Sequence, residues 1–157
     1  MHGTLSDADM DELLVSGIFG HLGYCDGNKP YVVPLAYVFH DGVIYGQTTE
    51  GRKIDLVRKN PLVCFQVQHE RNYEWRSVLC WGTFEEFDFE RLEHEEALPI
   101  LTLLTERLGG IQKNVGIVLP SFSLEGAAAA KTVDGRKSVL FRILVTERTG
   151  KFYRAEG

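Results

Sequence analysis

The stretch from Arg76 to Phe87 restricts most strongly what this chain can fold into. Its residues alternate between two faces, as in a β-strand, with Val78, Cys80, Gly82, Phe84 and Glu86 on one face and Leu79, Trp81, Thr83, Glu85 and Phe87 on the other. Gly82 lies in the middle of this run, where a glycine weakens a strand and marks a bend. A long strand that bends at its centre is typical of a barrel, so we expect a curved sheet.

Other runs rich in alternating or β-branched residues predict strands at residues 18–24, 31–40, 43–47, 62–68 and 138–147. Turn signals separate them. Asp26-Gly27-Asn28 and Thr149-Gly150-Lys151 have turn chemistry, Asp41-Gly42 predicts a tight hairpin, and residues 71–74 predict a polar loop. With residues 76–87, this makes about six strands.

Pro34 interrupts the expected strand at residues 31–40. Proline has no N–H group and cannot donate to a strand ladder. We therefore expect Pro34 either to form a bulge or to lie where the backbone edge faces away from the sheet.

Helix signals occur between the strands. Ser6 predicts an N-cap, with Gly17 at the end of the helix, and a second helix is expected from Arg52 to Lys59. A third helix would begin at Asp88, with an interruption at Pro99 and an end at Gly109-Gly110, and residues 111–136 predict a short helix plus a mobile loop. The pattern predicts an α+β fold, an antiparallel six-stranded barrel with flanking helices.

Length and charge limit the possible functions. A chain of 157 residues without a flexible linker or repeat predicts one domain over residues 1–157. A net charge of −5 argues against a general nucleic-acid binder and leaves a small anionic ligand as the better expectation. An acidic N-terminus and the lack of a long apolar run predict a cytoplasmic protein with no membrane segment.

Neither the cysteines nor the histidines predict a metal site. The cysteines, Cys25, Cys64 and Cys80, are far apart among apolar neighbours and predict buried reduced thiols. The histidines outside the N-terminus, His21, His40, His69 and His94, have no metal-ligand spacing.

The most informative polar stretch runs from Ile44 to Pro61. A strand end is followed by Thr48 and Thr49, which offer hydroxyls and a helix cap, and by Gly51, where a backbone can approach a ligand closely. Arg52 and Lys53 then begin the predicted helix, whose free N–H groups and dipole point at the space that both cations reach. This is a phosphate site in outline; the alternative is a surface helix with solvated cations.

The order of these motifs resembles the pyridoxamine 5′-phosphate oxidase-like split-barrel flavoproteins, in particular the branch related to 5-nitroimidazole reductases. The resemblance lies in KPYVVPLAYVFHDGVIYGQTTEGRKIDLVRKNPLVCFQV, WRSVLCWGTFEE and VLFRILVTERTGK. It implies an FMN-binding split barrel that forms a homodimer and holds FMN in a cleft between the two subunits.

The resemblance also assigns site residues. Arg52 and Lys53 would bind the FMN phosphate beside Gly51, with hydroxyl donors from Thr48 and Thr49. Pro34 and Leu35 would lie along the isoalloxazine ring, and Ser77 would contact the flavin from the long strand.

Gln47 departs from the family pattern, because the 5-nitroimidazole-reductase branch usually has a histidine at this position. Glutamine can still bind a flavin or a phosphate through hydrogen bonds, but it cannot change its charge near neutral pH. Chemistry that needs the histidine is therefore in doubt, whereas FMN binding is not.

The resemblance implies an FMN-dependent oxidoreductase that accepts hydride from a reduced nicotinamide and acts on an unidentified small molecule. The loop at residues 111–136 would cover the cleft. Two alternatives stay open: a flavin carrier or sensor without turnover, suggested by Gln47, and a haem-binding split barrel with His69 or His94 as the axial ligand.

Overall fold

The computed structural model describes residues 1–86, 98–100, 102–107, 132–133 and 136–155. Its elements are β1 (His2–Thr4), α1 (Asp7–Ser16), β2 (Phe19–Asp26), β3 (Lys29–His40), β4 (Val43–Thr49), α2 (Arg52–Lys59), β5 (Leu62–Arg71), β6 (Glu74–Glu86), β7 (Thr132–Val133) and β8 (Arg136–Arg154). Within these described residues, no helix is long and apolar enough to span a membrane.

Residues 98–100 and 102–107 are also helical, as expected for this part of the third predicted helix, but Pro99 itself is helical, so the predicted interruption at this residue is wrong. The beginning of that helix at Asp88 and its end at Gly109-Gly110 lie outside the described residues, as does most of the segment expected as a helix and loop at 111–136. The last residues of that segment form β7 and the start of β8, so the loop prediction is wrong there.

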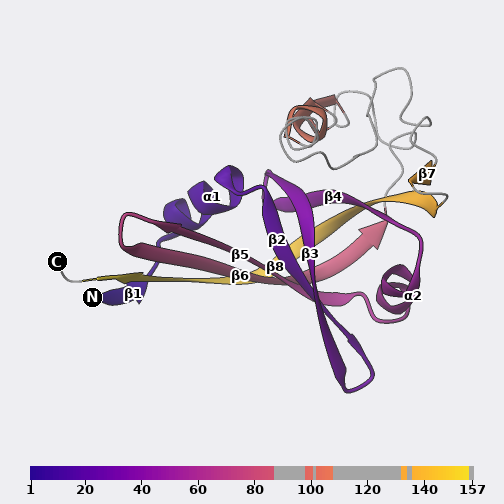
Figure 1. Ribbon diagram of the computed structural model, residues 1–157, viewed down its shortest axis with the longest axis horizontal. Coiled ribbons are helices and arrows are strands. Elements are labelled where there is room, and N and C mark those ends of the chain that lie inside the picture. The colour runs from indigo at the N-terminus through magenta and orange to yellow at the C-terminus, as the bar shows by residue number, and fades with distance from the viewer. Residues whose placement is uncertain (87–97, 101, 108–131, 134–135, 156–157) are drawn as a thin grey trace.

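Six strands close into an antiparallel ring in the order β8-β4-β3-β2-β5-β6, because β6 also pairs with β8. The long β8 closes the ring by pairing with β4 over residues 138–144 and with β6 over residues 141–154. β1 and β7 are added to β8. Figure 1 shows α2 and the turn between β5 and β6 at opposite ends of the molecule. The predicted antiparallel six-stranded barrel with flanking helices is confirmed.

Aromatic side chains fill much of the barrel interior. Tyr37, Phe65 and Phe141 are the largest of the fully buried side chains. The rings of Tyr37 and Phe65 meet edge to face with centroids 5.1 Å apart, and Phe84 stacks on Phe141 at 4.9 Å. Because each such side chain contributes roughly 1.5–3 kcal/mol when buried, this cluster is a major source of stability.

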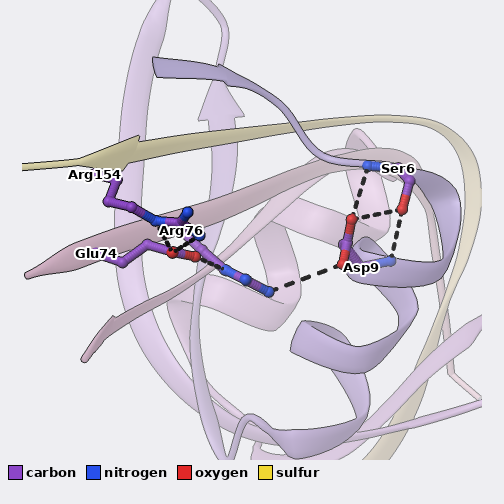
Figure 2. A network of polar contacts seen from close by, with 5 residues as sticks. All are labelled: Ser6, Asp9, Glu74, Arg76 and Arg154. Carbon is purple, nitrogen blue, oxygen red and sulfur yellow. Dashed lines mark hydrogen bonds and ion pairs between the residues drawn. The ribbon is translucent and has the colours of Figure 1, made fainter. Parts of the chain in front are cut away.

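The start of α1 is tied to the sheet through a polar network (Figure 2). Ser6 is the N-cap, as predicted, and forms a capping box with Asp9. Arg76 of β6 lies 3.9 Å from the Asp9 carboxylate and also pairs with Glu74, which accepts a hydrogen bond of 2.7 Å from Nε of Arg154 in β8. The network therefore joins α1, β6 and β8.

β3 continues through Pro34 with no change of register, and His21 of β2 lies opposite. The N–H of Tyr37 donates to Ile18 on the β2 side. Because successive N–H positions point to alternate edges of a strand, the nitrogen of Pro34 faces the other edge, where the ladder with β4 starts only at Tyr37. Of the two predicted explanations, the unpaired edge is therefore confirmed, and the bulge is wrong.

Three predictions rest on glycines in or between strands. The predictions at Gly42 and Gly82 agree with the structure, and the one at Gly150 does not. Asp41 and Gly42 both have positive φ, 50° and 78°, and form the predicted tight hairpin turn. The sheet register shifts between Trp81 and Gly82, at the position where a bend was predicted, and such a shift bends the strand. The predicted turn at 149–151 is wrong, because β8 runs without interruption to Arg154.

The packing around Gly150 explains why residues 149–151 form no turn. A Cβ at this position would lie 2.7 Å from atoms of Leu5 and Met10. The glycine therefore allows the N-terminal segment to approach β8 closely, and it serves no turn.

The polar loop predicted at residues 71–74 is also shorter than expected. Only Asn72 and Tyr73 form the turn, with φ of 52° and 61°.

Candidate functional site

α2 begins shortly after β4 and spans Arg52–Lys59, as predicted. Its N-cap is Gly51, which makes no side-chain cap hydrogen bond, so the prediction that a threonine caps this helix is wrong. Thr48 and Thr49 are still part of the β4–β8 ladder, which places them too early in the chain to cap the helix. Because a glycine cap has no side chain, it does not accept hydrogen bonds from the first N–H groups of α2. These groups and the positive end of the helix dipole can therefore interact with an anion.

Arg52, the first residue of α2, lies against the β2–β3 hairpin. Its Nη2 donates a hydrogen bond of 3.0 Å to the hydroxyl of Tyr31 and lies 3.8 Å from a carboxylate oxygen of Asp26. The ring of Tyr31 in turn stacks on Tyr24. The Arg52 side chain is 71% exposed, so this cation remains accessible to a ligand.

Lys53 is the second cation and is half-buried at the start of α2. Within the part of the chain that the structure describes, it makes no hydrogen bond or ion pair, and burial lowers its pKa. Holding an ammonium group in such a place without a partner costs free energy. An anion bound there would offset that cost, so Lys53 and the helix N–H groups fit a phosphate.

β3 and β4 separate near the end of β4, shortly before α2 begins. The ladder between β3 and β4 ends at Tyr37 and Gly46. Five predicted site residues lie just beyond its end: Pro34, Leu35, Gln47, Thr48 and Thr49. All five residues therefore lie within three positions of the point where β3 and β4 separate.

The alternation of side chains divides these five residues between two faces. Thr48 shares its face of β4 with the core residue Ile44 and is only 8% exposed, and Leu35 packs against the core. Gln47 and Thr49 lie on the opposite face of β4, and Pro34 is exposed. A ligand on the outer face would therefore meet Gln47 and Thr49 before Thr48.

Ser77 is the predicted site residue that the structure places elsewhere. It lies near the start of β6 and accepts a hydrogen bond of 3.0 Å from Nε2 of Gln66. The part of β6 next to the end of α2 is Thr83, which pairs with Leu62, the first residue of β5. Thr83 is six positions after Ser77, which corresponds to roughly 20 Å at the usual rise per residue of a strand. Ser77 therefore lies well along β6 from the strand ends that follow α2.

Four residues around α2 were missed by the sequence reasoning: Asp26, Tyr31, Glu50 and Arg58. Asp26 and Tyr31 reach Arg52 only through the register of the hairpin, which no local pattern shows. Glu50 and Arg58 form an ion pair across α2 with a spacing that differs from the usual helical i, i+4 pair. The sequence signal for this pair was an acidic residue just before the helix and a basic residue in its last turn.

An apolar row crosses the outer face of the sheet. Val32, Gly23, Cys64 and Trp81 are successive ladder partners on β3, β2, β5 and β6. Val32 is 69% exposed, and Trp81 is also exposed. The row thus carries exposed apolar side chains on β3 and β6, with the half-buried Gly23 and Cys64 between them, and exposed apolar surface of this kind can mark an interaction site.

The described cysteines and histidines form no metal centre. Among the described residues, no group of three or more histidine, cysteine or acidic side chains could hold a metal ion. The three cysteines are free, and burial raises the pKa of Cys80 to about 11. Of the two axial ligands considered for haem, His94 lies outside the described residues. His69 lines a pocket with Arg71, Glu74 and Arg76, whose charges do not suit the apolar face of a porphyrin.

A closed six-stranded antiparallel barrel, with a basic helix start beside an opened strand pair, defines a split-barrel protein. The family described as "Pyridoxamine 5'-phosphate oxidase" matches residues 6–115, and the chain belongs to this family. The predicted family is thus confirmed.

Similar proteins agree with this result. A FAD-binding protein of Mesorhizobium loti is 26% identical in sequence, with a TM-score of 0.72, and the match covers 98% of this chain and 99% of that one. A proposed 5-nitroimidazole antibiotic resistance protein of Bacteroides thetaiotaomicron has the same fold, with a TM-score of 0.66 at 21% identity over 97% and 87% of the two chains. An uncharacterized protein of Rhizobium meliloti is 28% identical over 105 residues, which are 66% of this chain and 70% of that protein.

Proposed function

We propose that this protein binds FMN, with the phosphate at the start of α2. The observation that carries the proposal is the half-buried Lys53 ammonium, which has no partner among the described residues and lies next to the exposed Arg52 at a helix start capped by glycine. Family membership supports the same ligand class, and the similar protein of Mesorhizobium loti is described as FAD-binding. FMN is preferred over FAD because it ends in a single phosphate, which one helix start and two cations match.

The other residues near α2 have supporting roles in this proposal. Gln47 and Thr49 offer an amide and a hydroxyl on the outer face of β4, next to the phosphate position. Pro34 leaves the facing edge of β3 without a donor, so the neighbouring carbonyl groups can meet the polar edge of the flavin ring. The protein supplies binding and orientation, while the bound flavin supplies two-electron chemistry.

A homodimer completes the proposed site. Along β6, Ser77 is roughly 20 Å from Thr83, whose partner Leu62 follows α2, and we expect a second copy to bring Ser77 to the same flavin. The row of Val32, Cys64 and Trp81, in which Val32 and Trp81 are exposed and Cys64 is half-buried, offers an apolar surface for that contact. We expect Trp81→Glu to convert a dimer into a monomer in light-scattering measurements; a wild-type monomer at micromolar concentration would contradict the dimer.

The binding proposal is tested with purified protein and added FMN or FAD. We expect flavin absorbance to stay with the protein, and FMN to bind more tightly than FAD in fluorescence titrations. Arg52→Ala combined with Lys53→Ala should weaken FMN binding by a few kcal/mol, because each charge-assisted contact contributes roughly 1.5–3 kcal/mol. Lys59→Ala, at the other end of α2, is the matched control and should bind normally. Equal affinity for the double variant and the control would place the phosphate elsewhere.

We further propose that the protein is an oxidoreductase that uses a reduced nicotinamide as electron donor. The competing function is a flavin carrier or sensor, which Gln47 favours because an amide cannot transfer a proton near neutral pH. Steady-state oxidation of NADH or NADPH by the FMN-loaded protein separates the two functions. Sustained turnover excludes the carrier, and flavin that stays oxidised with both donors excludes this oxidoreductase.

A further inference from the structure

Arg58, in the last turn of α2, makes the densest set of ion pairs around this helix. Its guanidinium binds Glu50 through two hydrogen bonds, Nη1–Oε2 at 2.9 Å and Nη2–Oε1 at 2.6 Å. The same group binds Glu86 of β6 through Nε–Oε2 at 3.1 Å and Nη2–Oε1 at 2.6 Å. Asp55 is a third, more distant partner at 3.6 Å.

The position of Glu50 gives these contacts a consequence for ligand binding. Glu50 directly precedes Gly51, the N-cap of α2, and is two residues from Arg52. A carboxylate beside a helix start is attracted to the free N–H groups, to the dipole and to nearby cations. Unless it is held elsewhere, the Glu50 carboxylate would occupy the place that a phosphate needs.

Arg58 holds this carboxylate on the flank of α2. Its two parallel hydrogen bonds direct Glu50 away from the helix start and compensate its charge. Glu86 fixes the guanidinium from β6, and the ion pairs with Glu86 and Glu50 raise the pKa of Arg58. Arg58 therefore stays charged over the ordinary pH range.

We propose that Arg58 is a positioning residue for anion binding, which keeps Glu50 from competing with the flavin phosphate at the start of α2. The inference rests on the proposed FMN site and adds a second requirement to it. Arg52 and Lys53 attract the phosphate, while Arg58 withdraws the one acidic side chain that directly precedes the helix cap.

The test is a double-mutant cycle on the affinity for FMN, measured by flavin fluorescence at low ionic strength. Arg58→Gln should weaken binding about tenfold, because it removes the two hydrogen bonds that direct the Glu50 carboxylate away from the helix start. Glu50→Gln alone should change the affinity less than threefold or so, since Arg58 already compensates this charge in the wild type. The double variant should return to within about threefold of the wild type.

A purely structural role of Arg58 predicts a different result. If the arginine only anchored α2 to β6, Glu50→Gln would not rescue Arg58→Gln, and Glu86→Gln would weaken binding as much as Arg58→Gln does. Either that pattern or an unchanged affinity of Arg58→Gln would overturn the proposal. Arg58→Lys, which keeps the charge but loses the paired hydrogen bonds, serves if Arg58→Gln does not fold. It should show a smaller loss, again rescued by Glu50→Gln.

The same titrations separate this inference from the proposed function. A wild type that does not bind FMN, or a combined Arg52→Ala and Lys53→Ala variant with unchanged affinity, would refute the phosphate site itself. A wild type that binds FMN through Arg52 and Lys53, with Arg58→Gln equal to the wild type, would refute only the role of Arg58.

Discussion

The guanidinium of Arg52 donates a hydrogen bond of 3.0 Å to the hydroxyl of Tyr31, which joins the start of α2 to the β2–β3 hairpin. The same guanidinium lies 3.8 Å from the carboxylate of Asp26 and 5.5 Å from the centre of the Tyr31 ring. The hairpin therefore sets both the position of this cation and the negative charge nearest to it.

Asp26→Asn should strengthen FMN binding, because it removes a carboxylate that competes with the phosphate for Arg52. Both side chains are largely exposed, so we expect only a two- to fivefold gain at low salt, about 0.4–1 kcal/mol, which high salt abolishes. Asp41→Asn, in the hairpin turn at the other end of β3, is the control and should leave the affinity unchanged. A gain of equal size in both variants would show a general effect of net charge.

Lys53→Met should stabilise the protein while weakening FMN binding. The native state pays to hold this half-buried ammonium, as its lowered pKa shows, and methionine keeps most of the apolar stem. We expect a gain of up to about 1 kcal/mol in the free energy of unfolding at neutral pH, measured in urea. Because the folded-state pKa of Lys53 is lowered, this gain should shrink as the pH rises through that pKa, where the wild-type lysine becomes neutral. A destabilised variant would show that the ammonium is compensated in the native state.

Glu74→Gln should remove part of the acid sensitivity of the fold. Hydrogen bonds from Arg76 and Arg154 lower the pKa of Glu74 below its usual value of 4.5. Its contribution to stability is therefore complete above pH 4.5 and is lost as the pH falls through the lower folded-state value. The variant should be less stable than the wild type at neutral pH, and the difference should narrow in acid. Glu70→Gln, on the neighbouring strand, is the control in pH-dependent urea denaturation.

Tyr37→Phe should destabilise the fold. The hydroxyl of Tyr37 donates a buried hydrogen bond of 2.7 Å to the carbonyl of Leu14 in α1, and its loss leaves that carbonyl unpaired. We expect a cost of about 1–3 kcal/mol in urea denaturation. Tyr153→Phe, at a tyrosine that is 55% exposed, should cost less than about 0.5 kcal/mol. Similar values for the two variants would mean that the hydrogen bond of Tyr37 contributes little.

Local chemistry in the sequence was sufficient for several elements. The bounds of α2 follow from its basic residues and the Asn60-Pro61 stop. The Asp41-Gly42 pair predicts the turn, because both residue types tolerate the positive φ that the turn requires. Gly82 predicts the bend in β6, where the register shifts. Each depends on interactions within a few residues, which the sequence shows directly. The same is true of Arg52 and Lys53, since both belong to the first turn of one helix.

Long-range contacts decided the rest. Gly150 has turn chemistry, but β6 on one edge of β8 and the packing of Leu5 and Met10 hold it in an extended strand. The separation of Ser77 from α2 and the ion pairs of Arg58 with Glu50 and Glu86 follow from strand register. The single domain over residues 1–157, the cytoplasmic location and the homodimer stay predictions.

The order of motifs in the sequence identified the family by resemblance. Strand periodicity and helix termini, which neighbouring residues encode, predicted the six-stranded barrel and the basic start of α2. Only the tertiary structure decided which charges surround that start. It placed Asp26 beside Arg52, left Lys53 half-buried without a partner among the described residues, and paired Glu50 with Arg58. These relationships depend on how the hairpin, the helix and β6 pack together, and no local pattern of residues specifies that packing.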